Sequence, residues 1–140
     1  MKIYYYPEFN GTIRIYAVAS KSDGECVVYS YLSGLACNGA DRIRVKILQL
    51  ISRIAEEKLK NRQKFTSLKG KKKPMIWELK HKGHRLYGVF LDIDFLFLCC
   101  SGDHDKQKFD IKAAENIRDK YILAFSEGNL HIEESLKGLY

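Results

Sequence analysis

The sequence predicts a single α+β domain, in which an antiparallel meander of strands has helices before and after it. Its stretch 75–100 divides into three short, β-prone runs separated by Lys82-Gly83-His84 and Asp92-Ile93-Asp94, residues that favour tight turns. Two further segments, 41–59 and 110–125, carry apolar residues at helical spacing. A chain of 140 residues is also about the length of one domain.

The N-terminal segment predicts a strand at 12–19. Asn10-Gly11 stands before this alternating, β-branched run, and such a pair is a strong hairpin signal. Pro7 limits the first arm of that hairpin to a sheet edge or a loop, because proline cannot donate a ladder hydrogen bond.

Two helices are expected next. In segment 23–35 the residue types favour a strand, but apolar residues fall at helical spacing behind Asp23, a good N-cap, and we choose a short helix. The following segment has the clearest helical pattern in the chain and opens on Asn38-Gly39-Ala40-Asp41. Its apolar stripe holds Ile43, Ile47, Leu50, Ile51 and Ile54, so this helix should cover one face of the sheet. The polar segment 60–74 predicts a loop.

The later elements are the meander and a second long helix. The strand predicted at 85–92 alternates, with Arg85 and Tyr87 on one face and Leu86 on the other. The strand at 95–100 is apolar on both faces, so it should lie inside the sheet. The helix at 110–125 is expected to bury Ile111, Ala114, Ile117, Arg118, Tyr121, Ile122 and Phe125. Residues 129–140 should form a C-terminal extension, either a loose helix or a tail.

Charge is the strongest functional signal in the composition. The net charge is +7, and between Lys58 and Arg85 eleven lysines or arginines accompany one acid, Glu78. This local basicity predicts an anionic partner, either nucleic acid or an acidic polypeptide. The chain has no apolar run of about 20 residues and no signal-peptide block at its start, so we expect a cytoplasmic protein without a membrane partner.

Metal binding is not expected. The chain has four cysteines and no secretion signal, so reduced thiols are predicted. Cys99 and Cys100 are adjacent on a strand and should point to opposite faces, which keeps both from binding one ion.

Several short motifs follow one another along residues 12–125. They are GECVVYSYLSGL at 24–35, FTSLKG at 65–70, IWELK at 76–80, GHRLY at 83–87 and AAENIRDKY at 113–121. In this order they resemble the HigB branch of the RelE/ParE toxin superfamily, which includes phage-derived HigB-like proteins. The resemblance implies one toxin domain over 1–140, with a small RelE-like fold.

The resemblance also implies an activity. Such toxins are endoribonucleases that cleave mRNA, on the ribosome or free of it, and a cognate antitoxin protein neutralises them. The ribose 2′-OH attacks its own phosphate and yields a 2′,3′-cyclic phosphate and a 5′-OH, with no metal or other cofactor. This chemistry needs a base, an acid and cations around the phosphate, and a planar guanidinium binds two phosphate oxygens at once.

Two catalytic candidates match the motifs of the family. Arg85 stands at the most recurrent basic position on the second meander strand, and Lys80 stands where HigB-like proteins carry Arg or Lys after Trp-Glu-Leu. If the two strands pair across Lys82-Gly83-His84, both side chains should reach the same face.

The chain also departs from the family. RelE proper uses two lysines on the first meander strand, where Ile76 and Glu78 stand here, and Glu78 is better read as the partner of a neighbouring cation. HigB-like proteins often place Phe-x-Lys-Lys after the last strand, where His104 and Lys106 are the catalytic candidates in this chain. RNA-binding candidates are Lys71, Lys72, Lys73, Lys82, His84 and Lys108. The same lysines and histidines are also compatible with solvated loops and turns.

Two other functions remain open. One is a ParE-like toxin that acts by binding gyrase or another protein without cutting RNA. The other is a non-catalytic basic protein that binds nucleic acid. The missing lysine pair favours these two alternatives, whereas Arg85, Lys80 and the basic segment before them favour the nuclease.

Overall fold

The computed structural model describes residues 1–9, 11–19, 24–68, 70, 74–102 and 107–134. These residues form a seven-stranded mixed sheet and three helices, which confirms the predicted α+β class. In chain order the elements are β1 (Lys2–Tyr5), β2 (Arg14–Val18), α1 (Val27–Cys37), α2 (Asp41–Ala55), β3 (Phe65–Ser67), β4 (Trp77–His81), β5 (His84–Leu91), β6 (Asp94–Ser101), α3 (Gln107–Ser126) and β7 (His131–Glu134).

The sheet is mixed, so the prediction of a purely antiparallel meander was incomplete. Its strand order is β3-β4-β5-β6-β2-β1-β7. Strands β3 to β6 pair antiparallel, but β2 lies parallel to β6, and β7 lies parallel to β1. The chain between β2 and the meander includes α1 and α2, and a long connection of this kind lets two strands pair in the same direction.

The N-terminal hairpin and both early helices form, with some differences in detail. β1 pairs with β2, and β1 is not an edge strand as Pro7 had suggested, because β7 pairs along its outer side. Neither helix has a side-chain cap: the N-cap residues are Cys26 for α1 and Ala40 for α2. The predicted cap Asp23 lies outside the described residues.

Two short strands were not predicted. β3 lies in the segment expected to be a loop, where Phe65 pairs with Leu79 of β4. β7 replaces the expected loose helix or tail at 131–134, and the terminal amine of Met1 donates to the carbonyl oxygen of Asn129 at 2.8 Å beside it. Both strands have only three or four residues, so partner strands rather than local propensity determine them.

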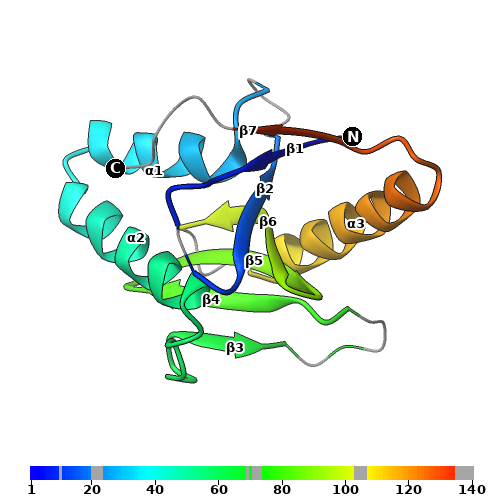
Figure 1. Cartoon of the computed structure of the whole chain (residues 1–140). Helices are drawn as coiled ribbons and strands as arrows, with labels where there is room; N and C mark the ends of the chain where they lie inside the picture. Colours follow the sequence, from blue (N-terminus) through cyan, green and yellow to red (C-terminus); the bar gives the residue numbers. More distant parts are fainter. Residues whose placement is uncertain (10, 20–23, 69, 71–73, 103–106, 135–140) are drawn as a thin grey trace.

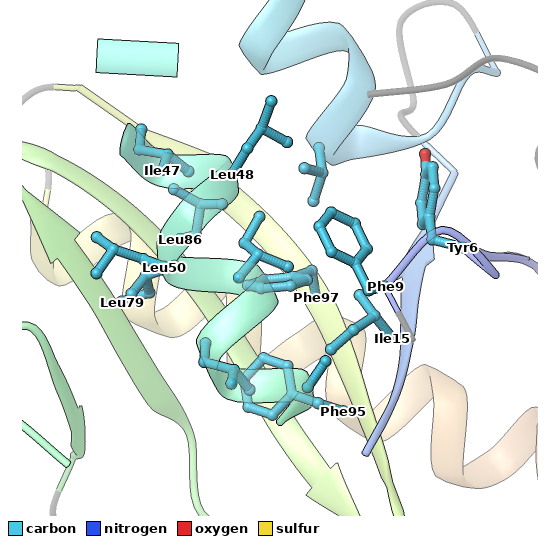
Figure 2. Packing of buried hydrophobic residues seen from close by; sticks show 14 of the residues in the cluster. Tyr6, Phe9, Ile15, Ile47, Leu48, Leu50, Leu79, Leu86, Phe95 and Phe97 are labelled. Atoms are coloured by element: carbon cyan, nitrogen blue, oxygen red, sulfur yellow. The ribbon is translucent and has the colours of Figure 1, made fainter. Parts of the chain in front are cut away.

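Helices cover the sheet on both faces: α1 and α2 lie on one side and α3 on the other (Figure 1). The larger core fills the side of α1 and α2, where Figure 2 shows side chains of α2 packed over the central strands. Labelled members of this cluster are Tyr6, Phe9, Ile15, Ile47, Leu48, Leu50, Leu79, Leu86, Phe95 and Phe97.

Strand β6 lies between the two cores, as predicted. Phe95 and Phe97 belong to the cluster under α1 and α2, while Leu96 and Leu98 belong to the cluster under α3, and all four are 0% exposed. Burial on both faces requires apolar residues at successive positions, so the run lacks the alternation of a half-exposed strand.

The buried face of α3 is shorter than predicted. Ala114 and Arg118 are buried, and Ile111, Ile117 and Tyr121 pack against the sheet. The last two members of the predicted stripe are exposed, Ile122 at 37% and Phe125 at 66%. Phe125 lines an open pocket with Tyr16 of β2 and Ile132 of β7, so it lies beside the sheet without being covered by it.

Candidate functional site

The hairpin of β4 and β5 has a two-residue turn. Its register pairs Lys80 with Arg85 and His81 with His84. The turn residues Lys82 and Gly83 both have positive φ, at 46° and 82°, as the type I′ turn of a tight hairpin requires. Directly opposed residues point to the same face, so Lys80 and Arg85 share one face, as predicted, and the two histidines share the other.

On the face of α1 and α2, His84 contacts Tyr31. The Tyr31 hydroxyl lies 2.5 Å from Nδ1 of His84, and the two rings meet edge to face with centroids 5.9 Å apart. Burial raises the pKa of Tyr31 to about 12, with a further contribution from Cys100, and burial lowers the pKa of His84. Both side chains are therefore uncharged at neutral pH.

His81 lies beside a group of lysines. It is 8% exposed, and the Lys64 Nζ lies 3.1 Å from its Nδ1. Burial lowers the pKa of His81, and the positive charges of Lys64, Lys82 and Lys46 lower it further. These lysines come from the segment before β3, from the turn and from α2. We call Lys46, Lys64, His81, Lys82 and His84 the hairpin rim; its converging positive charge attracts anions.

On the opposite face, Arg85 is buried with Glu78. They are 7% and 3% exposed, and Nε of Arg85 lies 3.4 Å from Oε2 of Glu78. This contact is an ion pair that is not aligned as a hydrogen bond. Gln107, the first residue of α3, donates to the same carboxylate oxygen at 3.0 Å. Glu78 is thus the partner of a neighbouring cation, as predicted, and the first turn of α3 covers the pair.

Several buried polar atoms near this ion pair have no hydrogen-bond partner among the described residues. They are Nε and Nη1 of Arg85, the Tyr87 hydroxyl and Oδ2 of Asp110. Burial raises the pKa of Tyr87, and the charge of Glu78 raises it further. Arg85 therefore retains hydrogen-bonding capacity in a site that is largely shielded from solvent.

The remaining predicted site residues are distributed as follows. Lys80 is half-buried on the α3 side, whereas Lys82 in the turn and Lys108 in the first turn of α3 are exposed. The candidates Lys71, Lys72, Lys73, His104 and Lys106 lie outside the described residues.

Sequence reasoning missed Tyr31, Lys46 and Lys64. Tyr31 stands in the segment predicted to be a short helix, and nothing in that local pattern indicates a partner 53 positions later. The two lysines stood among many others; the pairing of β3 with β4 brings Lys64 near His81, and α2 contributes Lys46.

No cluster of three or more His, Cys, Asp or Glu side chains in the described part of the chain could hold a metal ion. Of the three described helices, none is long and apolar enough to cross a membrane.

Comparisons with known proteins give no match. No protein-family model matches the chain. Neither a curated protein nor a solved structure matches it.

Proposed function

We propose that this chain is an endoribonuclease of the toxin kind, which binds RNA at the hairpin rim and cleaves it without a metal ion. The observation that carries the proposal is the hairpin rim itself, where two histidines with lowered pKa lie among lysines from three parts of the chain. Lysines attract the phosphate backbone, and uncharged imidazoles can exchange protons near neutral pH.

The proposed reaction is the attack of a ribose 2′-OH on the adjacent phosphate. It yields a 2′,3′-cyclic phosphate and a 5′-OH end. Each positioned proton-transfer group contributes typically ~10² to 10⁴ in rate, so a few such groups suffice for a nuclease. Cations such as Lys64 and Lys82 would stabilise the charge that develops on the phosphoryl oxygens.

Arg85 and Lys80 keep their proposed catalytic roles, on the other face of the same hairpin. Lys80 is half-buried on the α3 side of the hairpin beside the turn, so its catalytic role requires bound RNA to extend around the turn from the rim. Arg85 is buried beside Glu78, which Gln107 also contacts, so its catalytic role requires this site to open to the RNA. His104 and Lys106 complete the proposed set.

The order of the elements supports a RelE-like fold. A strand, two helices, a three-stranded meander and a helix follow one another from β2 to α3, apart from the added β3. On this proposal the partners are mRNA, the ribosome and a cognate antitoxin.

The proposal is tested with purified protein, a labelled mRNA and EDTA, with and without ribosomes. We expect fragments that end in a 2′,3′-cyclic phosphate and begin with a 5′-OH. Arg85→Ala and His84→Ala should reduce the cleavage rate ~10²-fold or more. His131→Ala and Lys112→Ala, which remove exposed residues of β7 and α3, are matched controls and should cleave normally. Intact mRNA in both reactions would refute the proposal.

A second candidate function is binding to a protein target without RNA cleavage. It is favoured by apolar side chains that α3 and β7 expose: Phe109 at 76%, Leu123 at 58%, Phe125 at 66% and Ile132 at 56%. Phe125 and Ile132 line one pocket, and exposed apolar residues that lie together are typical of interaction surfaces. Growth arrest with intact mRNA and trapped gyrase, relieved by Leu123→Asp, would support this candidate instead. Salt-sensitive nucleic-acid binding without arrest or cleavage would indicate a non-catalytic binding protein.

A further inference from the structure

The two ring nitrogens of His84 differ in their contacts with the described residues. Its Nδ1 meets the Tyr31 hydroxyl at 2.5 Å, while its Nε2 has no hydrogen-bond partner among the described residues. A neutral imidazole carries its proton on one nitrogen only, and the hydrogen bond at the first nitrogen decides which one. The hydrogen bond with Tyr31 at Nδ1 therefore bears on whether Nε2 carries the proton.

The Tyr31 hydroxyl is able to donate this hydrogen bond. The hydroxyl of Tyr31 keeps its proton, since burial raises its pKa to about 12. A phenolic O–H is a good donor, and a deprotonated ring nitrogen is a good acceptor. A phenol can also accept from a protonated Nδ1, so the contact fits either tautomer; when the Tyr31 hydroxyl donates to Nδ1, the imidazole proton is on Nε2.

We propose that Tyr31 is a positioning residue that holds His84 as a neutral imidazole with its proton on Nε2, and that this proton passes to the 5′-oxygen that leaves when RNA is cleaved. The inference rests on the proposed function. His84 would then be the general acid of the reaction.

The step balances in atoms and charge. As the bond between phosphorus and the 5′-oxygen breaks, its electron pair stays on oxygen, which takes the proton from Nε2 of His84. Nδ1 takes the hydroxyl proton of Tyr31 in the same step, so His84 stays neutral and Tyr31 becomes a phenolate. Solvent water accepts the proton of the attacking 2′-OH, and the phenolate recovers a proton from solvent.

The packing around the pair restricts its geometry. Among the described residues, Cys100 of β6 contributes to the raised pKa of Tyr31, and His84 contributes to the lowered pKa of His81 in β4. Gly102 follows β6, and a Cβ at this position would lie 2.9 Å from the Tyr31 hydroxyl and 3.2 Å from Nδ1 of His84. Gly102→Ala would therefore displace the hydroxyl while keeping both partner side chains.

The first test measures the tautomer of His84 by two-bond ¹H–¹⁵N NMR on the full chain, without RNA. We expect the wild-type signal of a proton on Nε2, and a mixture of both tautomers in Tyr31→Phe and Gly102→Ala. Tyr121→Phe, which alters a half-buried tyrosine on the other side of the sheet, should leave the signal unchanged. A proton on Nδ1 in the wild type, or an unchanged signal in Tyr31→Phe, would overturn the inference.

The second test uses an RNA in which sulfur replaces the 5′-oxygen at the cleavage site, because a thiolate leaves without protonation. On ordinary RNA, His84→Gln and Tyr31→Phe should each cleave ~10²-fold more slowly than the wild type. On the sulfur substrate both variants should cleave at the wild-type rate. A defect that persists on the sulfur substrate would show that the pair is not the acid.

The two tests separate the two proposals. If the wild type cleaves neither RNA, the proposed function fails, and the acid role fails with it, whatever the NMR signal shows. If the wild type cleaves both and the variants match it, the nuclease stands and the inference about Tyr31 and His84 fails.

Discussion

Replacing Glu78 with glutamine leaves the guanidinium of Arg85 without its counter-charge in a site that excludes solvent. Side-chain exposure is only 4% for Glu78 and 9% for Arg85, so water cannot replace the lost carboxylate. The substitution keeps the size of the side chain, and it therefore removes charge without opening a cavity. The change thus isolates the electrostatic contribution of the ion pair.

The expected loss follows from this burial. Removing one partner of a buried ion pair costs about 3–5 kcal/mol, because the other charge stays desolvated. For a chain of this length each kcal/mol lowers the melting temperature by about 3–4 °C, so a fall of roughly 10–20 °C is expected. Replacing both partners with leucine should cost less than Glu78→Gln alone, since no charge is then buried.

Urea denaturation of the wild type, Glu78→Gln and the double variant measures these free energies of unfolding. Glu133→Gln is the matched control, because Lys2 and Glu133 form an ion pair at 3.0 Å with both side chains 44% exposed. Such a surface pair contributes about 0–1 kcal/mol. A loss in Glu78→Gln no larger than in this control would refute the reasoning that the Glu78–Arg85 pair is desolvated.

Three other outcomes are expected. Gly88→Ala should cost about 1–3 kcal/mol or more in urea denaturation, because its Cβ would lie 2.4 Å from the Phe95 ring and 2.7 Å from the Leu96 carbonyl oxygen. Gly34→Ala, inside α1 and with no atom within 4 Å of the new Cβ, should instead stabilise by about 0.5–1 kcal/mol, and a loss there would contradict the open site. The pKa values of His81 and His84 lie below 6.5 in the folded chain. At a pH between these lowered pKa values and 6.5, the unfolded chain therefore binds more protons than the folded chain. The free energy of unfolding should therefore be insensitive to these groups above pH 6.5 and fall as the pH drops below it, and the double variant with glutamine at both positions should show a smaller fall.

The helices and the meander could be predicted because their signals are local. The apolar stripe of α2 and the unbroken apolar run of β6 each reflect a burial pattern that repeats within one element. Lys82-Gly83 likewise specified the tight turn of the hairpin, and with it the pairing of Lys80 with Arg85.

The short strands and the exposed end of α3 could not be predicted in this way. β3 and β7 have too few residues to show a period, and each is stabilised by hydrogen bonds to a strand distant in sequence. Ile122 and Phe125 are as apolar as buried residues, so their sequence does not show that they are exposed at the end of α3.

The candidate site likewise combines features set by local sequence with features set by tertiary contacts. The sequence by itself determined that a basic hairpin would present Lys80 and Arg85 on one face, because a two-residue turn and the alternation of strands are local rules. Only the tertiary structure decided that Arg85 is covered by the first turn of α3 and that His84 meets Tyr31, 53 positions earlier. The physical reason is that burial and hydrogen-bond partners depend on which elements pack together, and a pattern within one element carries no information about its neighbour.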